Sequence, residues 1–186
     1  ETKTGVTTFF IDDKIDTGAM ILSKETPISS TENAGEFHYR LMSIGSQAVV
    51  ETLALIEKGN VVTTIQTDSS EIKTAYKLNK DNCKIDFSKS GVEIYNLIRG
   101  LSPYPSAWCF FKDGTEEWNV KLYEVKLVEE SHNFETGSII TTKKEIRIAV
   151  NNGFLEILSL QFPGKKRMKS FELLNGISFS TNAKAV

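Results

Sequence analysis

The stretch Gly5-Val-Thr-Thr-Phe-Phe-Ile-Asp-Asp-Lys-Ile-Asp-Thr-Gly-Ala-Met-Ile-Leu22 decides how the first part of the chain folds. Residues 5–11 are rich in β-branched and aromatic side chains, which favour a strand. Residues 12–18 combine Asp, Thr and Gly, which are typical of turns. Residues 19–22 are apolar again and predict a second short strand. The stretch therefore predicts two strands joined by a turn.

A long helix is predicted after these strands. Residues 27–31 predict a loop that ends in residues able to cap a helix. From Asn33 to Lys58, apolar side chains recur at three- and four-residue spacings, as on one face of a helix. Gly59 is a natural helix end. Because two strands and one helix cannot bury a core of their own, we interpret residues 1–59 as the C-terminal end of a larger α/β domain.

The polar residues 60–82, which include Gln66-Thr-Asp-Ser-Ser70, show no sustained period and predict a linker. Asp86-Phe-Ser88 then predicts the cap of a helix that stops at Gly100. Pro103-Tyr-Pro105 prevents any continuation of this helix. Its apolar positions are Val92, Ile94, Leu97 and Ile98.

Residues 83–186 form the last predicted domain. The dipeptides Asp113-Gly114 and Asn152-Gly153 are typical of tight hairpin turns. About five short strands after a helix indicate a small OB-like β-barrel, a fold that is often used on nucleic acid. Fold alone does not establish that function. Strands are predicted over residues 107–111, 118–128, 138–142, 145–150 and 153–160.

Composition limits the class of protein. Of the 186 residues, 40% are hydrophobic and 25% are charged, which is ordinary for a globular protein. No apolar run approaches the roughly 18 residues of a spanning helix, and no signal peptide is expected from the polar start. Cys83 and Cys109 are too few for a disulfide scaffold or a cysteine-rich zinc site, and they fit a reducing compartment. We therefore expect a cytoplasmic protein.

Charge is unevenly distributed along the chain. The net charge is −2, yet residues 143–186 contain eight Lys or Arg and only three Asp or Glu. This basic segment is consistent with a polyanionic partner on one face of the protein. A solvated charged face would have the same composition, so charge alone leaves both interpretations open.

Ile11-Asp-Asp-Lys-Ile-Asp-Thr-Gly18 is the segment most suggestive of chemistry. A carboxylate at the end of an α/β strand is well placed to act as a general base or to orient another group. Three carboxylates could instead bind a divalent cation, which prefers several oxygen ligands. In the simplest interpretation Asp and Gly only close the turn. The residues by themselves leave all three interpretations open.

The chain resembles the folate-dependent formyltransferases over nearly its whole length, through five motifs in family order. In the first motif, Ile15 stands where the family usually has Leu. In another, Phe87 takes the place of Trp. Five motifs in order are specific where any single one is not. They are Thr4–Thr7 with Ile15–Gly18, Asn33–Leu41, Lys84–Ser88, Asn96–Pro105 and Leu160–Met168.

The resemblance implies the end of a Rossmann-like formyltransferase domain in residues 1–59, a linker in residues 60–82 and an RNA-facing barrel in residues 83–186. It implies formyl transfer from 10-formyltetrahydrofolate to methionine esterified to initiator tRNA. The family polarises the formyl oxygen with an Asn and a His. Asp16 matches the family's catalytic aspartate, which orients that His and water and relays protons. No Asn-x-His pair precedes Asp16, so we expect this chain alone to be inactive, with most of the folate pocket missing and no metal site.

The resemblance also implies which residues hold the tRNA. Attraction to phosphate is independent of sequence, so these residues would position the tRNA and not select it. In the alternative, they are simply solvated lysines of a linker and a hairpin. Arg99 could pair with Asp86 or face RNA. The matching basic residues are Lys77, Lys80, Lys165, Lys166, Arg167 and Lys169.

The histidines and tryptophans have simpler expected roles. We expect His38 and His132 at the surface. We expect Trp108 and Trp118 to pack within the barrel, with stacking on a base as the alternative.

Two other functions fit part of this pattern. A formyltransferase acting on an amino sugar nucleotide or in folate metabolism would share the Asp-Thr-Gly segment but would not use the Gly164–Lys169 cluster on RNA. A stand-alone RNA-binding barrel with a vestigial α/β piece would belong to another class of protein. For the formyltransferase that the resemblance implies, we expect a monomer that does not associate with membranes.

Overall fold

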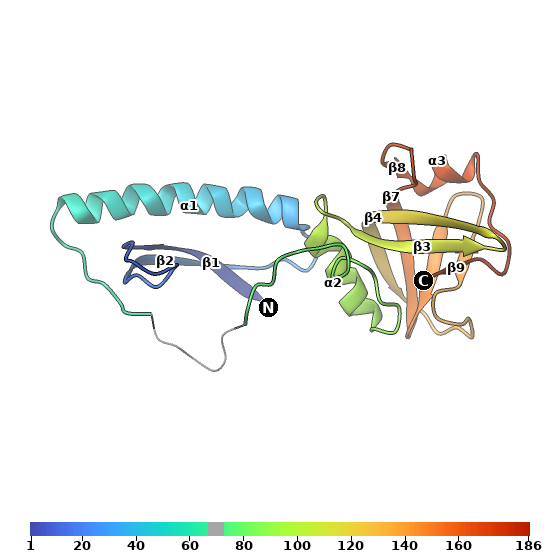
Figure 1. Ribbon diagram of the computed structural model, residues 1–186, viewed down its shortest axis with the longest axis horizontal. Helices are drawn as coiled ribbons and strands as arrows, with labels where there is room; N and C mark the ends of the chain where they lie inside the picture. The colour runs from blue at the N-terminus through green and yellow to red at the C-terminus, as the bar shows by residue number, and fades with distance from the viewer. Residues whose placement is uncertain (67–72) are drawn as a thin grey trace. The chain divides into compact units, whose positions relative to one another are not determined.

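The computed structural model describes residues 1–66 and 73–186, which form two compact units, Glu1–Tyr76 and Lys77–Val186 (Figure 1). No helix within these described residues is long and apolar enough to cross a membrane. Six residues of the predicted linker, residues 67–72, lie outside the described residues.

The first unit consists of a β-hairpin and a long helix. Strand β1, Lys3–Phe9, pairs antiparallel with β2, Met20–Pro27. Helix α1, Ala34–Glu57, lies along this hairpin (Figure 1). The predicted order of strand, turn, strand and helix is confirmed. Strand β2 extends beyond the predicted residues 19–22, because the polar residues 23–26 pair with β1 through their backbone and need no apolar side chains to do so.

Capping groups set both ends of α1. The Asn33 side chain accepts a hydrogen bond from the Glu36 N–H, and the Glu36 side chain accepts one from the Asn33 N–H, both at 3.0 Å. Lys58 caps the C-terminal end, and Gly59 follows with φ of 67°. Glycine adopts this left-handed conformation at little cost. The predicted helix and its end at Gly59 are therefore confirmed.

Helix α1 leaves much of its apolar surface uncovered within the first unit. In α1, whose residues are all described, only Ala48 and Thr52 are buried. The side chains of Tyr39, Val50 and Leu53 are exposed. A hairpin and one helix present too little surface to enclose a core, as the sequence indicates.

The second unit contains α2, Gly91–Leu101, whose N-terminal cap is Ser90. The Ser90 hydroxyl accepts a hydrogen bond from the Glu93 N–H at 3.3 Å, and the Glu93 carboxylate accepts one from the Ser90 N–H at 3.0 Å. These reciprocal bonds form a capping box. They also account for the lowered pKa of the Glu93 carboxyl, because both the hydroxyl and the N–H of Ser90 donate to the charged form.

Two details of the predicted helix are wrong. Asp86-Phe-Ser88 does not cap α2, because the Asp86 carboxylate instead accepts bonds from the N–H and hydroxyl of Ser88 and closes a separate turn. The helix also continues past Gly100, because Leu101 is buried in the core and extends the helix by one residue.

The rest of the second unit is an antiparallel sheet with strand order β5-β6-β7-β4-β3-β9 and with β8 paired to β7. The five predicted strands are confirmed. Two additional strands and a short helix were not predicted, because segments of two to five residues are too short to show a period. The elements are β3 Ala107–Asp113, β4 Glu116–Glu129, β5 Ile139–Thr141, β6 Ile146–Val150, β7 Gly153–Gln161, β8 Met168–Lys169, α3 Ser170–Leu174 and β9 Lys184–Ala185.

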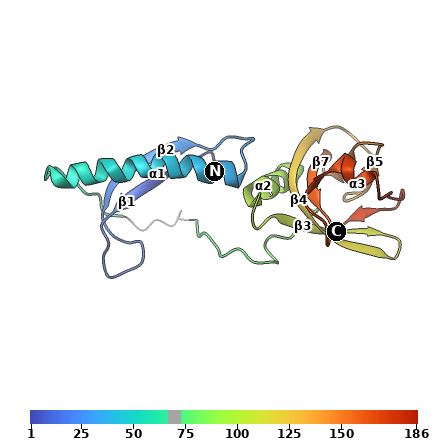
Figure 2. The ribbon, with the colours of Figure 1, turned by 90° about the horizontal axis from the view of Figure 1, so that it is seen from above.

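The two ends of this sheet meet and make it a nearly closed barrel (Figure 2). The Ile139 N–H donates to the Ala183 carbonyl at 2.9 Å, and the Ala185 N–H donates to the Gly137 carbonyl at 2.8 Å. Closure pairs backbone groups that a free sheet edge would expose. The prediction of a C-terminal β-barrel preceded by a helix is confirmed. Its OB-like topology remains a prediction.

The hydrophobic core of the second unit lies within this barrel and under α2. Phe111 is fully buried, and its ring meets those of Phe162 and Phe179 at 5.9 Å each. Trp118 packs on Phe162 at 5.7 Å, which confirms its predicted packing role. Burial also raises the pKa of the Cys109 thiol far above its ordinary value, since the thiolate would be desolvated there. Other core side chains are Ile94, Ile98, Leu122, Ile146, Ile148, Leu155, Ile157 and Leu160.

Candidate functional site

The loop that joins β1 to β2 holds Asp16 in a fixed position. The Asp12 carboxylate accepts hydrogen bonds from the Lys14 N–H at 3.0 Å and from the Thr17 hydroxyl at 2.9 Å. The Gln66 amide donates to the carbonyls of Asp16 and Gly18 at 2.9 and 2.8 Å. Asp16 itself has φ of 56°, a left-handed conformation that Asp tolerates better than most residues. Backbone and side-chain bonds therefore fix the main chain at Asp16.

Gly18 closes the same loop. A Cβ atom at this position would lie 1.5 Å from the Phe10 carbonyl oxygen. The Phe10 N–H donates to the Ala19 carbonyl at 3.0 Å, so the two sides of the loop are in close contact here. This close approach explains why the Ile15–Gly18 motif ends in glycine.

The Asp16 side chain is exposed. Within the described residues its carboxylate makes no hydrogen bond or ion pair, so it is available to a partner from outside them. No group of three His, Cys, Asp or Glu side chains suited to a metal occurs among residues 1–66 and 73–186. The exposed Asp16 carboxylate can therefore orient a hydrogen-bond donor or relay a proton.

The first pair of predicted RNA contacts, Lys77 and Lys80, lies just before the barrel. Both side chains are exposed. The Asn82 side-chain amide donates to the Lys77 carbonyl at 3.0 Å, and the Trp108 indole N–H donates to the Lys80 carbonyl at 2.7 Å. The Lys80 ammonium lies 5.3 Å from the indole centroid, within the range of a cation–π contact. Trp108 is buried, which confirms its predicted packing role.

The second predicted group divides into two parts. Gly164 turns the chain with φ of 71° after β7, and the exposed Lys165 and Lys166 follow it. Neither ammonium is paired with a carboxylate in the described part of the chain. These two lysines therefore offer positive charge that no neighbouring carboxylate neutralises.

Arg167 and Lys169 make contacts with other residues of the barrel. Both lie near the Glu124 carboxylate, at 3.8 Å for Arg167 and 3.1 Å for Lys169. The Arg167 guanidinium also donates to the Ser159 hydroxyl at 2.7 Å and lies 4.7 Å from the ring centroid of Tyr123. Their charge is partly neutralised, so they are weaker candidates for phosphate contact than Lys165 and Lys166.

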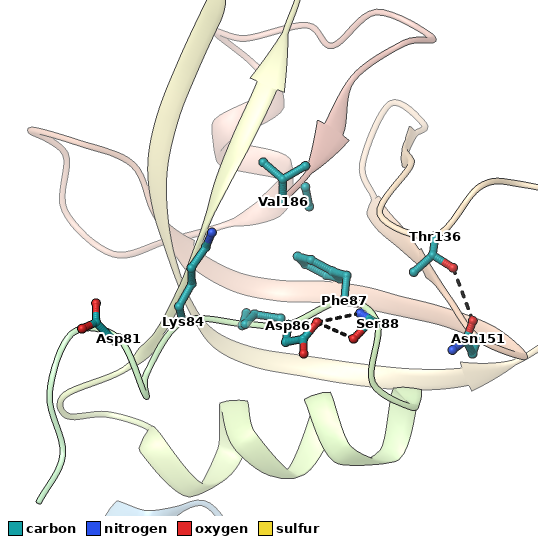
Figure 3. Close-up of a pocket in the computed structure, with 10 residues that line it drawn as sticks. Asp81, Lys84, Asp86, Phe87, Ser88, Thr136, Asn151 and Val186 are labelled. Carbon is teal, nitrogen blue, oxygen red and sulfur yellow. Dashed lines mark hydrogen bonds between the residues drawn. The ribbon is translucent and has the colours of Figure 1, made fainter.

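A recess in the second unit contains the motif Lys84–Ser88 (Figure 3). Its volume is about 730 Å³. Figure 3 shows that Ser88 donates to the Asp86 carboxylate on one side of the recess. On the other side, the Thr136 hydroxyl bonds to the Asn151 side chain. The hydrogen bonds from Ser88 lower the pKa of the Asp86 carboxyl, because they stabilise its charged form. We therefore interpret this family motif as a structural turn at the rim of the recess.

Three further side chains have identifiable places. His38 is exposed on α1, as predicted. The prediction that His132 is a plain surface residue is wrong, because its ring is half-buried, lies 4.4 Å from the Phe154 ring and bonds through Nε2 to the carbonyls of Val150 and Gly153. Arg99 donates to the Asn96 side chain at 2.7 Å, and its orientation toward RNA remains a prediction.

Sequence reasoning assigned no contact with RNA to three side chains near the basic residues. Tyr104 is exposed beside Trp108, and Lys84 lies 5.8 Å from the Trp108 ring centroid. Lys121 is the register partner of Trp108 across β3 and β4. The alternating pattern of residues 118–128 indicates only that Lys121 points outward. That it lies opposite Trp108 depends on the register of β3 and β4, which the sequence does not show.

The comparisons with known proteins define the class to which this fold and loop belong. Residues 77–178 match the formyl transferase C-terminal domain, and residues 1–53 match the formyl transferase family. The chain belongs to the formyl transferase family.

Two relatives carry a more particular name. A methionyl-tRNA formyltransferase from Flavobacterium johnsoniae is 67% identical over 184 residues, which is 99% of this chain and 58% of that protein. A methionyl-tRNA formyltransferase from Flavobacterium psychrophilum is 66% identical over 180 residues, or 97% of this chain and 57% of that protein. This chain therefore spans somewhat more than half the length of these relatives.

A solved structure supports the fold. HypX from Aquifex aeolicus, in complex with tetrahydrofolic acid, superposes with a TM-score of 0.68 and 18% identity. The match covers 94% of this chain and 30% of HypX. At this identity the similarity concerns the fold alone.

Proposed function

We propose that this chain is the C-terminal part of a methionyl-tRNA formyltransferase. Such an enzyme transfers the formyl group of 10-formyltetrahydrofolate to the amino group of methionyl-initiator tRNA for translation initiation. The observation that carries the proposal is 67% identity, over 99% of the chain, to a protein of that name. The match to the formyl transferase family supports a folate as formyl donor.

In this proposal the chain has three parts. Residues 1–59 complete the Rossmann-like catalytic domain, which explains why α1 leaves Tyr39, Val50 and Leu53 uncovered. Residues 60–82 form the linker, and residues 83–186 form an OB-like domain that binds tRNA. The boundary between the two compact units, at Tyr76 and Lys77, lies within the proposed linker.

In the proposed reaction, Asp16 directs the transfer of a proton from the methionine amine to folate N10. A bond forms between the methionine nitrogen and the formyl carbon, the bond from that carbon to folate N10 breaks, and a proton passes from the amine to N10. The fixed loop presents the Asp16 carboxylate outward, where it orients the histidine and water that carry this proton. The formyl oxygen becomes negative in the tetrahedral intermediate and needs donors from the Asn and His that the family supplies upstream.

The barrel positions the tRNA. Lys77, Lys80, Lys165 and Lys166 are exposed, and none is paired with a carboxylate in the described part of the chain. Their ammonium groups are suited to phosphates. Arg167 and Lys169 add positive charge near the same loop, but both also form ion pairs with the Glu124 carboxylate.

The identity of the acceptor tests this proposal. With 10-formyltetrahydrofolate as donor, the full-length protein that contains this chain should formylate methionyl-initiator tRNA and should not formylate an amino sugar nucleotide. Formylmethionine released from the tRNA and the formylated sugar nucleotide would both be measured by mass spectrometry. This 186-residue chain alone, as the matched control, should transfer nothing. Formylation of the sugar nucleotide in place of the tRNA, or turnover by this chain alone, would contradict the proposal.

A further inference from the structure

A pocket of about 460 Å³ lies where the segment before the barrel crosses the start of β3. Leu78, Cys83, Tyr104, Pro105 and Trp108 provide aromatic and aliphatic walls. Its two charged lining residues are lysines, Lys80 and Lys121. The volume is that of a small-molecule site, and the combination of aromatic walls with positive charge suits a planar ring that carries a phosphate.

The two aromatic side chains of this pocket differ in their freedom. Trp108 is held in place, since its indole N–H donates to the Lys80 carbonyl and the Phe110 ring meets it edge-on at 5.3 Å. Tyr104 is 87% exposed and has no hydrogen-bond or ring partner in the described part of the chain. Leu78, on the opposite segment, is 53% exposed. A large uncovered aromatic ring beside an apolar pocket can stack on a partner.

Lys121 connects this pocket to the basic loop after β7. Trp108, Lys121 and Gln161 are register partners on β3, β4 and β7, so their side chains form one row on the same face of the sheet. The Gln161 amide then donates to the Lys165 carbonyl at 2.8 Å. Lys121 also lines the recess that Gly164 borders. A continuous row therefore runs from Trp108 through Lys121 to Lys165.

We propose that this pocket accepts one unpaired nucleobase of the bound RNA, stacked on Tyr104, with its flanking phosphates on Lys80 and Lys121. The inference rests on the proposed function, which makes RNA the partner of the barrel. Charge complementarity favours this occupant over an apolar peptide, because neither Lys80 nor Lys121 is paired with a carboxylate within the described residues. Stacking is tolerant of base identity, so the pocket would hold an unpaired nucleotide without selecting its sequence.

The test uses the 186-residue chain and two single strands of equal length, an oligoadenylate and an abasic ribose–phosphate strand. Fluorescence titration at one salt concentration should show oligoadenylate binding at least about fivefold more tightly than the abasic strand, since one stacked base contributes upward of that factor. Tyr104→Ala should abolish this difference, and Tyr104→Phe should retain it. Phe171→Ala removes another half-exposed ring of the same unit and should change neither affinity.

A spectroscopic measurement places the base. Trp118→Phe leaves Trp108 as the remaining tryptophan, and oligoadenylate should quench its emission where the abasic strand does not. Because Trp118 packs against Phe162, the Tyr104 variants are also compared with Trp118 intact. Equal affinity for the two strands, or an unchanged difference in Tyr104→Ala, would overturn the proposal that the pocket binds a base. If both strands still bound in a salt-dependent way, the proposed RNA-binding function would stand. Absence of binding to either strand would contradict the pocket and the proposed RNA-binding role together.

Discussion

Replacing Asp16 with Asn in the full-length protein should lower kcat by about 10²- to 10⁴-fold, the usual contribution of a group that directs proton transfer. The substitution keeps the size of the side chain and removes its charge. The loop should remain intact, because Asp12 and Gln66 make its hydrogen bonds and the Asp16 carboxylate makes none within the described residues. Affinity for tRNA should stay unchanged, since the proposed RNA contacts belong to the second unit. Steady-state formylation and tRNA binding would be measured separately.

Asp13→Asn is the matched control for Asp16→Asn. Asp13 is an exposed carboxylate of the same loop, so its replacement makes the same change in net charge and should leave kcat within about threefold of the wild-type value. A similar decrease in both variants would indicate a general charge effect. A decrease of less than about threefold in Asp16→Asn would mean that Asp16 only closes the turn.

Phe111→Ala should lower the free energy of unfolding of the barrel by about 3–5 kcal/mol, the usual cost of removing a buried aromatic ring. Phe111 is fully buried, and its ring joins β3 to Phe162 and Phe179. Urea unfolding of the 186-residue chain would be followed by tryptophan fluorescence, because Trp118 packs on the same Phe162 ring. Phe171→Ala, at a half-exposed position, should change stability by no more than about 0.5 kcal/mol. Equal losses in the two variants would show that Phe111 does not anchor the core.

The parts of the fold that were predicted are those whose signal is local. The apolar spacing of residues 33–58 defines α1, and its capping residues lie within three positions of each other. The hairpin dipeptides work in the same way, since Gly114 and Asn152 adopt φ of 60° and 64° at the turns. Each of these features depends on neighbours along the chain.

The parts that were missed depend on distant segments. Strand β9 consists of two residues, and the bonds that fix this end of the chain come from Phe110 and Gly137. His132 is held by carbonyls of Val150 and Gly153, which lie some twenty residues further along. Sequence periodicity carries no information about such pairings, because they are set by how the barrel closes.

The candidate site shows the same limit. The sequence presents Lys165, Lys166, Arg167 and Lys169 as one basic cluster, but the structure pairs two of them with Glu124 on another strand. The location of Lys121 opposite Trp108 follows from the register of β3 and β4. Asp16 was found through its motif, and the structure adds that the loop around it is fixed.

The central claim for this chain is that its barrel holds tRNA through the exposed lysines after β7. The most direct measurement is a titration of the 186-residue chain with tRNA at several salt concentrations. Each phosphate contact steepens the dependence of log affinity on log salt by about 0.7–0.9, so Lys165→Ala with Lys166→Ala should flatten the slope by about 1.4–1.8. Lys143→Ala with Lys144→Ala removes two exposed lysines from the turn between β5 and β6 and should leave the slope unchanged. An unchanged slope in the first pair, or an equal change in both pairs, would contradict the account.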